Sequence, residues 1–269
     1  MLEDELKTVR DKMTGPSVTK RLYTGASLLG LATFAVSLIA VSVGPFNVPF
    51  SSTVSTMFDL VGIGNSTAEP TEQAIIQSIR LPRIFLAFIV GAALGISGGV
   101  MQALFRNSMA DPGIIGVSSG GAAGAVLVIA FGLNTLSALF LPLGAFIGSM
   151  MAMTVVFLIA NVGGKFSMAT LLLGGIAVSS FLSAITTAII ILTDDLTVQR
   201  QIIFWIAGGV DTARWESVQI ALPIIFVGIV ITIFAARDLN LLLVSEDEAR
   251  SLGVRVGLVR SVLMISASL

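Results

Sequence analysis

Stretches free of charged side chains alternate with short polar segments along this chain. Five of these stretches, which lack Asp, Glu, Lys and Arg, are 20 residues or longer. They are residues 22–58, 84–105, 112–164, 166–193 and 217–236. A helix of about 20 apolar residues crosses the hydrocarbon core of a bilayer, because it rises about 1.5 Å per residue. The pattern therefore predicts six full spans and a seventh that begins near Gly257 and is cut off at Leu269. The six predicted spans cover residues 22–44, 84–105, 113–132, 137–161, 167–193 and 216–236.

Polar residues between these stretches predict the shorter elements. The stretch 112–164 is long enough for two helices, and residues 132–134 predict the turn between them. Residues 45–80 carry prolines and acids and are too polar for lipid, with a short surface helix expected over 72–80 that runs into the second span. Residues 201–209 predict a short apolar helix that two glycines end, and nine residues are too few to cross a bilayer.

The positions of lysine and arginine predict which side of the membrane each loop faces. With the N-terminus inside, 11 of the 15 basic residues fall in inside segments and 4 in outside segments. Cytoplasmic loops carry the excess of Lys and Arg, so a cytoplasmic N-terminus is preferred. Residues 1–21 are then a cytoplasmic N-terminal segment before a retained first helix, rather than part of a cleaved signal peptide. The four outside residues are Arg80, Arg83, Arg200 and Arg214.

Composition supports a membrane protein and excludes several classes of function. Of the 269 residues, 55% are hydrophobic and 12% charged, about half the charged share of a soluble domain, and mean hydropathy is +0.98. A soluble, disordered or fibrous protein is excluded, and the predicted fold class is an all-α polytopic transmembrane helical bundle. The lack of His and Cys excludes disulfides, thiolate chemistry and histidine metal sites, so no metal site is predicted. A net charge of −1 argues against nucleic acid as a partner.

Small residues recur every four positions in three of the predicted helices. This spacing places each set on one helix face, where glycine lets two helices approach closely within a membrane. Tight packing is the preferred interpretation, and the alternative is that these faces and nearby serines line or gate a translocation path. The glycines are Gly91, Gly95 and Gly99, then Gly116, Gly120 and Gly124, then Gly144 and Gly148, with Ser97, Ser118, Ser119, Ser179 and Ser180 as candidate lining hydroxyls.

No charged side chain interrupts the predicted membrane stretches, so the sequence shows no relay for protons or ions at depth. Energy for transport would then come from another protein, or transport is passive. The nearest match to a nucleotide-binding P-loop is Gly163-Gly164-Lys165, but Phe166 follows where Ser or Thr is needed. The chain is therefore predicted not to be an enzyme and not to hold its own ATPase site.

Two inside loops combine turn formers with helix caps. The first covers residues 106–116, where Asp111 can cap a helix whose first residue is Pro112. The second covers residues 237–253, where Ser245 can begin a short amphipathic helix.

The second inside loop is predicted to form a cytoplasmic helix of roughly two turns. Glu248 completes a capping box with Ser245, three acids occupy the first turn, and Gly253 ends the helix. Ala249 and Leu252 are expected on one face and the acids on another. A linker helix at the lipid interface is one interpretation. Docking of a protein partner is preferred, because three acids are unfavourable on an anionic leaflet.

Five blocks of the sequence match the motifs of one transport family. Residues 80–83 read R-L-P-R, residues 91–102 follow G-A-A-L-x-x-S-G-x-x-x-Q, and residues 106–116 are similar to N-P-L-A-D-P-x-x-L-G. Residues 204–209 resemble a W-x-x-G segment, and residues 239–253 resemble L-N-x-L-x-L-G-E-x-x-A-x-x-L-G. On these motifs the chain, from about residue 22 to its end, resembles the FecCD-type permeases of ABC importers for iron-siderophores, haem and vitamin B12.

The sequence departs from the family pattern in three places. Ser108 and Met109 replace the family's Pro-Leu, and Ser245 stands where the family usually has Gly. The family has about ten spans, whereas this chain stops early in the seventh. Residues 22–269 are therefore interpreted as a transmembrane permease domain that is truncated at its C-terminus.

The resemblance implies a function and a set of partners. The chain would be the permease subunit of an importer in a bacterial cytoplasmic membrane, working with ATPase subunits, a second permease subunit and an extracytoplasmic binding protein. ATP would bind to the partner ATPase, and this chain would bind no cofactor. An iron-siderophore complex is the first expectation for the cargo, with haem and cobalamin behind it.

The resemblance also implies roles for particular residues. The coupling helix, expected in a groove of the ATPase, comprises Ser245, Glu246, Ala249, Leu252 and Gly253. Docking of the binding protein is expected at Arg80 and Arg83, for which anchoring at lipid headgroups is the alternative. The residues of the path or of helix packing are Gly91, Gly95, Ser97, Gly98, Gln102, Ser118, Ser119 and Gly120, and those of a conformational loop are Asn107, Asp111, Pro112 and Gly113.

Three rival interpretations belong to other classes. A membrane-embedded enzyme needs nucleophiles or metal ligands at depth, and the absence of His and Cys argues against it. An export or scaffold subunit of another ABC system disagrees with the match over the second inside loop. A truncated, non-functional or scaffold fragment of such a permease is the alternative that stays open.

Overall fold

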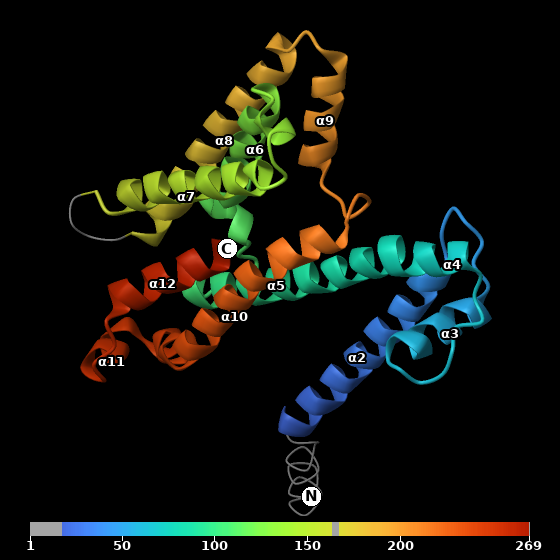
Figure 1. The fold of residues 1–269 in the computed structure, drawn as a ribbon. Helices are drawn as coiled ribbons and strands as arrows, with labels where there is room; N and C mark the ends of the chain where they lie inside the picture. The colour runs from blue at the N-terminus through green and yellow to red at the C-terminus, as the bar shows by residue number, and fades with distance from the viewer. Residues whose placement is uncertain (1–17, 163–166, 269) are drawn as a thin grey trace, which may run out of the picture. The chain divides into compact units, whose positions relative to one another are not determined.

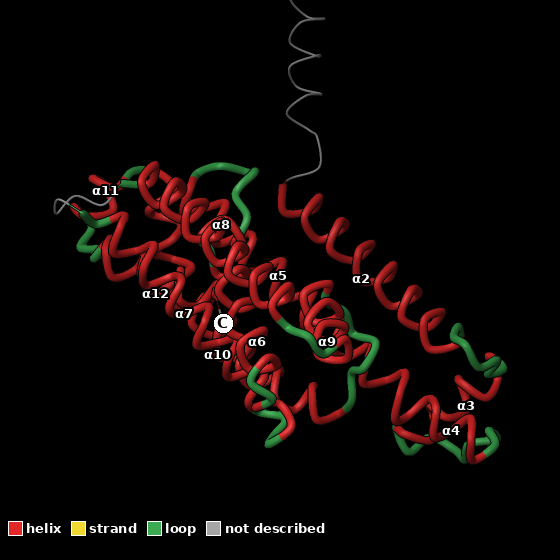
Figure 2. Tube along the Cα trace, turned by 90° about the horizontal axis from the view of Figure 1, so that it is seen from above, coloured by secondary structure: helices red, strands yellow, loops and turns green. Residues whose placement is uncertain are grey.

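The computed structural model of this protein describes residues 18–162 and 167–268. Within this described part, helix is the only regular secondary structure, which confirms the all-α prediction (Figure 2). Contacts divide the chain into two compact units, with the boundary between Ile84 and Phe85. Most of the predicted N-terminal segment, and the turn at residues 163–166 with its basic residue, lie outside the described residues.

The described part of the first unit consists of helices. They are α2 (Val18–Ser42), α3 (Phe50–Leu60) and α4 (Pro70–Ile75). The π-helix η1 (Ile76–Arg80) joins α4 to α5 (Leu81–Phe105) (Figure 1). Glu69 and Glu72 form a capping box at the start of α4, and Pro70 occupies the first helical position. The helix predicted over 72–80 is therefore present, and it runs without a break into the second span.

Helix α3 was not predicted from the sequence. Its buried positions are Ser52, Thr53 and Thr56 rather than apolar residues. The Thr56 hydroxyl donates to the Ser52 carbonyl at 2.8 Å and lies 3.0 Å from the Ser66 hydroxyl. The apolar residues Phe50, Val54 and Phe58 recur at helical spacing, so the sequence did carry a signal for α3, although Phe50 and Phe58 lie on its exposed side.

The second unit contains the remaining elements. They are the rest of α5, the 3₁₀ helix η2 (Pro112–Ile115), α6 (Val117–Ala130), the 3₁₀ helix η3 (Leu133–Thr135), α7 (Phe140–Ala160), α8 (Met168–Leu192), α9 (Leu196–Ala207), α10 (Trp215–Val244), α11 (Glu246–Ser251) and α12 (Val256–Ser268). Helices α6, α7 and α8 pack together, and α10 packs against both α11 and α12 (Figure 1).

Glycines bring α6 and α7 into backbone contact. A Cβ atom added to Gly120 or Gly124 would lie closer than 3.0 Å to the backbone of Gly148 or Gly144, and the reverse holds for Gly148. The Ser149 hydroxyl of α7 donates to a backbone carbonyl at the start of α6 at 2.9 Å. These glycines thus stand at a close helix contact, as the packing interpretation expects.

The glycine stripe of α5 has different surroundings. A Cβ atom added to Gly91, Gly95, Gly98 or Gly99 would meet no atom within 4 Å in the described part of the chain. The glycines of α5 and α6 thus have the same spacing along the sequence, but those of α6 contact another helix and those of α5 face open space among the described residues.

Five helices of the described residues are long and apolar enough to cross a membrane, counting α4, η1 and α5 as one. The predicted third span, 113–132, is wrong as a single helix, because Gly116 adopts a φ of 81° and separates η2 from α6. At 14 residues, α6 is about 21 Å long, short of the roughly 30 Å of a hydrocarbon core. Helix α12, the predicted seventh, has 13 residues.

Two further boundaries differ from the prediction. Helix α10 continues to Val244, so the first half of the second inside loop is helical. Helix α9 begins at Leu196 rather than 201, because the Asp195 carboxylate caps it by accepting a hydrogen bond from the Thr197 backbone N–H at 2.7 Å. That bond lowers the pKa of Asp195. The predicted end is present, with Gly208 at a φ of 70°.

Candidate functional site

The conformational loop predicted between α5 and α6 is tied by its own side chains. Asn107 Oδ1 accepts a hydrogen bond from the Met109 N–H at 2.9 Å, and Asp111 Oδ1 accepts one from the Gly113 N–H at 2.7 Å. Asp111 therefore acts as a cap, as predicted, but the helix that it caps is the short η2. Gly116, in the left-handed conformation, then redirects the chain into α6.

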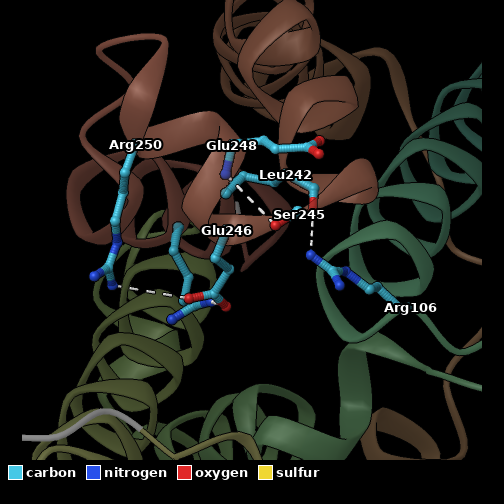
Figure 3. Close-up of polar contacts among 7 residues, drawn as sticks. Arg106, Leu242, Ser245, Glu246, Glu248 and Arg250 are labelled. Atoms are coloured by element: carbon cyan, nitrogen blue, oxygen red, sulfur yellow. Dashed lines mark hydrogen bonds and ion pairs between the residues drawn. The ribbon is translucent and has the colours of Figure 1, made fainter.

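Arg106 ends α5 in a conformation that glycine usually supplies. Its φ is 48°, and the backbone N–H groups of Arg106 and Asn107 return to the carbonyls of Ala103 and Gln102. This is the hydrogen-bond pattern of a Schellman cap, in which a residue with a Cβ is unfavourable. The side chain compensates, because Arg106 Nη2 donates to the Leu242 carbonyl at 2.5 Å (Figure 3).

The bond from Arg106 joins the ends of two helices that are far apart in sequence. Leu242 lies in the last turn of α10, where carbonyl groups have no partner within the helix. A guanidinium there satisfies one such carbonyl and interacts favourably with the negative end of the helix dipole. Arg106 thus connects the loop after α5 to the segment that leads into α11.

Ser245 separates α10 from α11 and caps the latter. Its hydroxyl accepts a hydrogen bond from the Glu248 N–H at 3.5 Å (Figure 3). The predicted reciprocal bond of a capping box is not formed, since the Ser245 N–H donates to the Leu241 carbonyl at 3.5 Å instead. The reason is that α10 runs on to Val244, which places this N–H over its last turn.

Glu246 forms ion pairs with two arginines where α10, α11 and α12 meet, a region that we call the α11 corner. Its carboxylate lies 2.5 Å from Arg260 Nη2 and 3.9 Å from Arg250 Nη2, and Figure 3 shows the pairing with Arg250. The Arg260 side chain is 9% exposed, whereas that of Glu246 is 43% exposed. A guanidinium buried to this degree needs an anionic partner, so Glu246 stabilises the first turns of α12 while anchoring α11 to them.

The two faces of α11 differ from the prediction. Ala249 is fully buried, in an apolar core that also contains Leu242, Val256 and Leu263. Leu252 is 67% exposed. The expectation that Ala249 and Leu252 share a face is therefore wrong, because Leu252 follows the last turn of α11 and Gly253, at a φ of 85°, turns the chain away. The acids Asp247 and Glu248 are exposed.

The predicted path serines line two cavities, whereas the predicted path glycines line neither. Ser97 and Ser118 line one of about 250 Å³, together with Pro112. Ser119 lines another of about 560 Å³. The second cavity also takes in Asn107, Asp111 and Gly113 of the loop, and Ser179 and Ser180 of α8. Gly91, Gly95 and Gln102 line neither cavity and are exposed on α5.

The predicted docking arginines belong to the first unit. Arg80 is 6% exposed, and its guanidinium donates to the carbonyls of Val41 and Phe46, each at 2.5 Å. Arg80 therefore stabilises the turn after α2. Arg83 is half-buried. Docking of a binding protein stays a prediction, and Arg80 would have to give up these two bonds to take part.

Sequence reasoning missed the structural roles of Arg106 and Arg260. Both were counted as positive charges of inside segments. Arg260 carried a usable signal, because it is the one charged residue within the otherwise apolar sequence of α12. Arg106 carried none, since nothing in the sequence marks a non-glycine residue for a positive φ.

A family model described as the FecCD transport family matches residues 31–269. The cobalamin import system permease protein BtuC of Halobacterium salinarum is 41% identical over 198 residues, which are 74% of this chain and 53% of that protein. The hemin transport system permease protein HmuU of Yersinia pestis is 41% identical over 182 residues, 66% of this chain and 54% of that protein. The chain thus spans about half the length of these two relatives.

Two further similarities cover more of the chain. The uncharacterized ABC transporter permease protein YvrB of Bacillus subtilis is 35% identical over 250 residues, 91% of this chain and 70% of that protein. A solved structure of a metal-chelate type ABC transporter in an inward-facing conformation has a TM-score of 0.70 and 31% identity. It covers 93% of this chain and 73% of that one.

Proposed function

Because this chain belongs to the FecCD transport family, we propose that it is the permease subunit of an ATP-binding-cassette importer in a bacterial cytoplasmic membrane. A separate ATPase subunit would supply the energy, a second permease subunit would complete the path, and an extracytoplasmic protein would deliver the cargo. The proposed cargo is an iron-siderophore complex, with a haem- or cobalamin-type chelate as the second candidate. The relatives named for cobalamin and hemin, and the structure named for a metal-chelate type transporter, support this range.

The observation that carries the proposal is that α11 has two different faces. The committed face packs against the rest of the chain, and the other face is exposed. Ala249 and Glu246 are engaged with the chain's own core and with Arg260. Asp247, Glu248 and Leu252 are exposed. Two acids beside an exposed leucine suit a partner groove with an apolar floor and a basic rim. We therefore propose that the exposed face of α11 receives the ATPase.

The contacts of the committed face can transmit a movement of α11 to the neighbouring helices. A push on α11 would reach α12 through Glu246 and Arg260, and it would reach α10 through Ser245. The bond from Arg106 to Leu242 extends this connection to the loop after α5. Closure of the ATPase would then move these helix ends together, as in rigid-body switches between two global states.

The two cavities support a translocation path that runs past the serines of α5 and α6. Ser97 and Ser118 contribute hydroxyls to one cavity, and Ser119 to the other. The loop that carries Asn107 and Asp111 lines the second cavity and is also joined to α10 by Arg106. We propose that movement of this loop, driven from α11, changes access to the path.

Replacing Leu252 by Asp tests the coupling proposal. Because Leu252 is 67% exposed, the variant should insert and fold normally but lose ATP-driven uptake. Leu136→Asp is a matched control, since Leu136 is 71% exposed near η3 and distant in sequence from α11. Normal uptake by Leu252→Asp in cells would reject α11 as the coupling element. Ala249→Arg is a poorer test, because burial of Ala249 links its effect to folding.

Docking of the binding protein is tested with the same logic. Arg83→Glu should weaken binding of the partner and reduce its dependence on salt, because charge pairs steer association. Arg80→Glu should in addition disturb the turn after α2, whose carbonyls Arg80 holds. Unchanged affinity and salt slope in both variants would reject docking at this segment.

The cargo is tested by uptake. Cells that produce this chain with its cognate ATPase and binding protein should accumulate a ferric siderophore, and should accumulate labelled haem and cobalamin less. The ligand that the binding protein retains on purification gives an independent reading. Uptake of cobalamin alone would replace the proposed cargo while leaving the permease assignment intact.

A further inference from the structure

A cavity of about 480 Å³ lies where the end of α10 meets the connection from α11 to α12. Its charged lining consists of Arg237 and Asp238 from α10 and Arg255 from the residues before α12. Leu241 and Leu258 are among its apolar lining residues. Leu252 and Gly253 of the coupling element also line this cavity, whereas Arg237, Asp238 and Arg255 have no role in the coupling proposal or the path proposal.

The two arginines stand where apolar helices end. Helix α10 begins at Trp215, and about 20 residues of it cross a hydrocarbon core. That length ends close to Phe234, which is 83% exposed, and Arg237 follows within one turn. Arg255 directly precedes the apolar helix α12. Both guanidiniums therefore belong to the headgroup level, on the inner side under the proposed orientation.

Among residues 18–162 and 167–268, neither arginine has a carboxylate partner. The ion pairs found among the described residues join Glu246 to Arg250 and Arg260, and no carboxylate lies within 4.0 Å of Arg237 or Arg255. Both side chains are exposed. With Asp238 included, the cavity carries two cations and one anion, so one added negative charge balances it.

We propose that this cavity binds the phosphate of an anionic phospholipid, such as phosphatidylglycerol, from the surrounding leaflet. Two guanidiniums can each donate two hydrogen bonds to phosphate oxygens, a geometry that lysine does not offer. Leu258, which is 57% exposed, supplies apolar surface beside the phosphate for an acyl chain. Basic pockets at the cytoplasmic ends of membrane helices bind lipid headgroups in this way. The bound lipid would brace the helix ends that flank α11.

The inference is tested by binding of soluble short-chain lipids. The purified chain, with the subunits that copurify with it, is titrated in detergent with dihexanoyl-phosphatidylglycerol and, separately, with dihexanoyl-phosphatidylcholine. We expect saturable binding of the first and roughly tenfold weaker binding of the second. Combined Arg237→Gln and Arg255→Gln should weaken phosphatidylglycerol binding by about tenfold or more, and each single change by part of that.

Arg200→Gln is the matched control, because Arg200 is an exposed arginine of α9 that does not line the cavity. It should leave phosphatidylglycerol binding unchanged. Equal losses in Arg200→Gln and the double variant would show general charge attraction and overturn the proposal. An unchanged affinity in the double variant would also overturn it.

Two other occupants are separated by the same experiment. Competition by inorganic phosphate at concentrations similar to those of the lipid would assign the cavity to a free anion. Release of the ATPase from the double variant, with phosphatidylglycerol binding intact, would assign it to the protein partner. Both results would reject the lipid. None of these readouts requires transport, so a wrong cargo or a wrong coupling element would leave the test informative.

Discussion

The contact between α6 and α7 and the contact among α10, α11 and α12 are both close, but they are built differently. In the first, Gly120 and Gly124 bring one backbone against another, so that no Cβ atom fits between them. In the second, Glu246 and Arg260 span the gap with long polar side chains, beside an apolar core that includes Ala249. Arg106 adds a third long side chain.

This difference teaches which parts of the second unit can move. Backbones in direct contact cannot slide without losing their packing, because protein interiors are close-packed. Long side chains can keep a charge-assisted hydrogen bond while the helices that carry them tilt. We expect α6 and α7 to move as one body, and the α11 corner to act as a joint.

The largest expected effect is at the glycine contact. Gly124→Val should destabilise the second unit by about 3 kcal/mol or more, since the new side chain meets backbone that cannot give way. Denaturant titration of the purified protein measures this. Gly95→Val is the matched control, because a Cβ atom there meets nothing within 4 Å in the described residues. Equal losses in both variants would remove the distinction between the two stripes.

A smaller effect is expected at the ion pair. Glu246→Arg or Arg260→Glu alone should cost about 1–3 kcal/mol, below the value for a fully buried pair because Glu246 is 43% exposed. The combined exchange should recover part of this loss and part of the uptake, and a double-mutant cycle gives the coupling free energy. Additive losses in the cycle would mean that the pair does not hold the joint.

The smallest expected effect is at Arg106. Arg106→Ala should cost about 0.5–1.5 kcal/mol, because the hydrogen bond to the Leu242 carbonyl is lost but the Arg106 side chain is exposed to solvent. Arg106→Gly should be more stable than Arg106→Ala by about 1 kcal/mol, since glycine accepts a positive φ without strain. If Gly and Ala give the same stability, the backbone at Arg106 does not favour the left-handed conformation.

The sequence was sufficient for most of the long helices, but not for α3, for the break before α6 or for the residues that each helix contacts. Charge-free stretches located the long spans, and Ser245, Asp111 and Gly208 were correctly placed at helix ends. Residues with identical spacing in α5 and α6 differ in what faces them, which spacing does not encode. The break at Gly116 escaped prediction because this stretch holds several glycines, and the sequence does not show which of them adopts a positive φ.

The site was predictable in part for the same reason. The motif at α11 identified Glu246 and Ala249, but their burial depends on Arg260 and on a core contributed by distant helices. Arg106 and Leu242 are 136 positions apart, so their bond follows from tertiary packing alone. Local signals of capping were thus readable, whereas contacts between helices were not.

Thiol labelling gives the most direct test that α11 presents one face to the ATPase and commits the other to its own chain. The protein contains no cysteine, so a single Cys at position 252 or 249 reports without background. Leu252→Cys should react rapidly with a maleimide in the isolated chain and at least about tenfold more slowly when the ATPase is bound. Ala249→Cys should stay protected in both states, because Ala249 is fully buried. Equal labelling of Leu252→Cys with and without the ATPase would contradict the assignment of α11 as the coupling element.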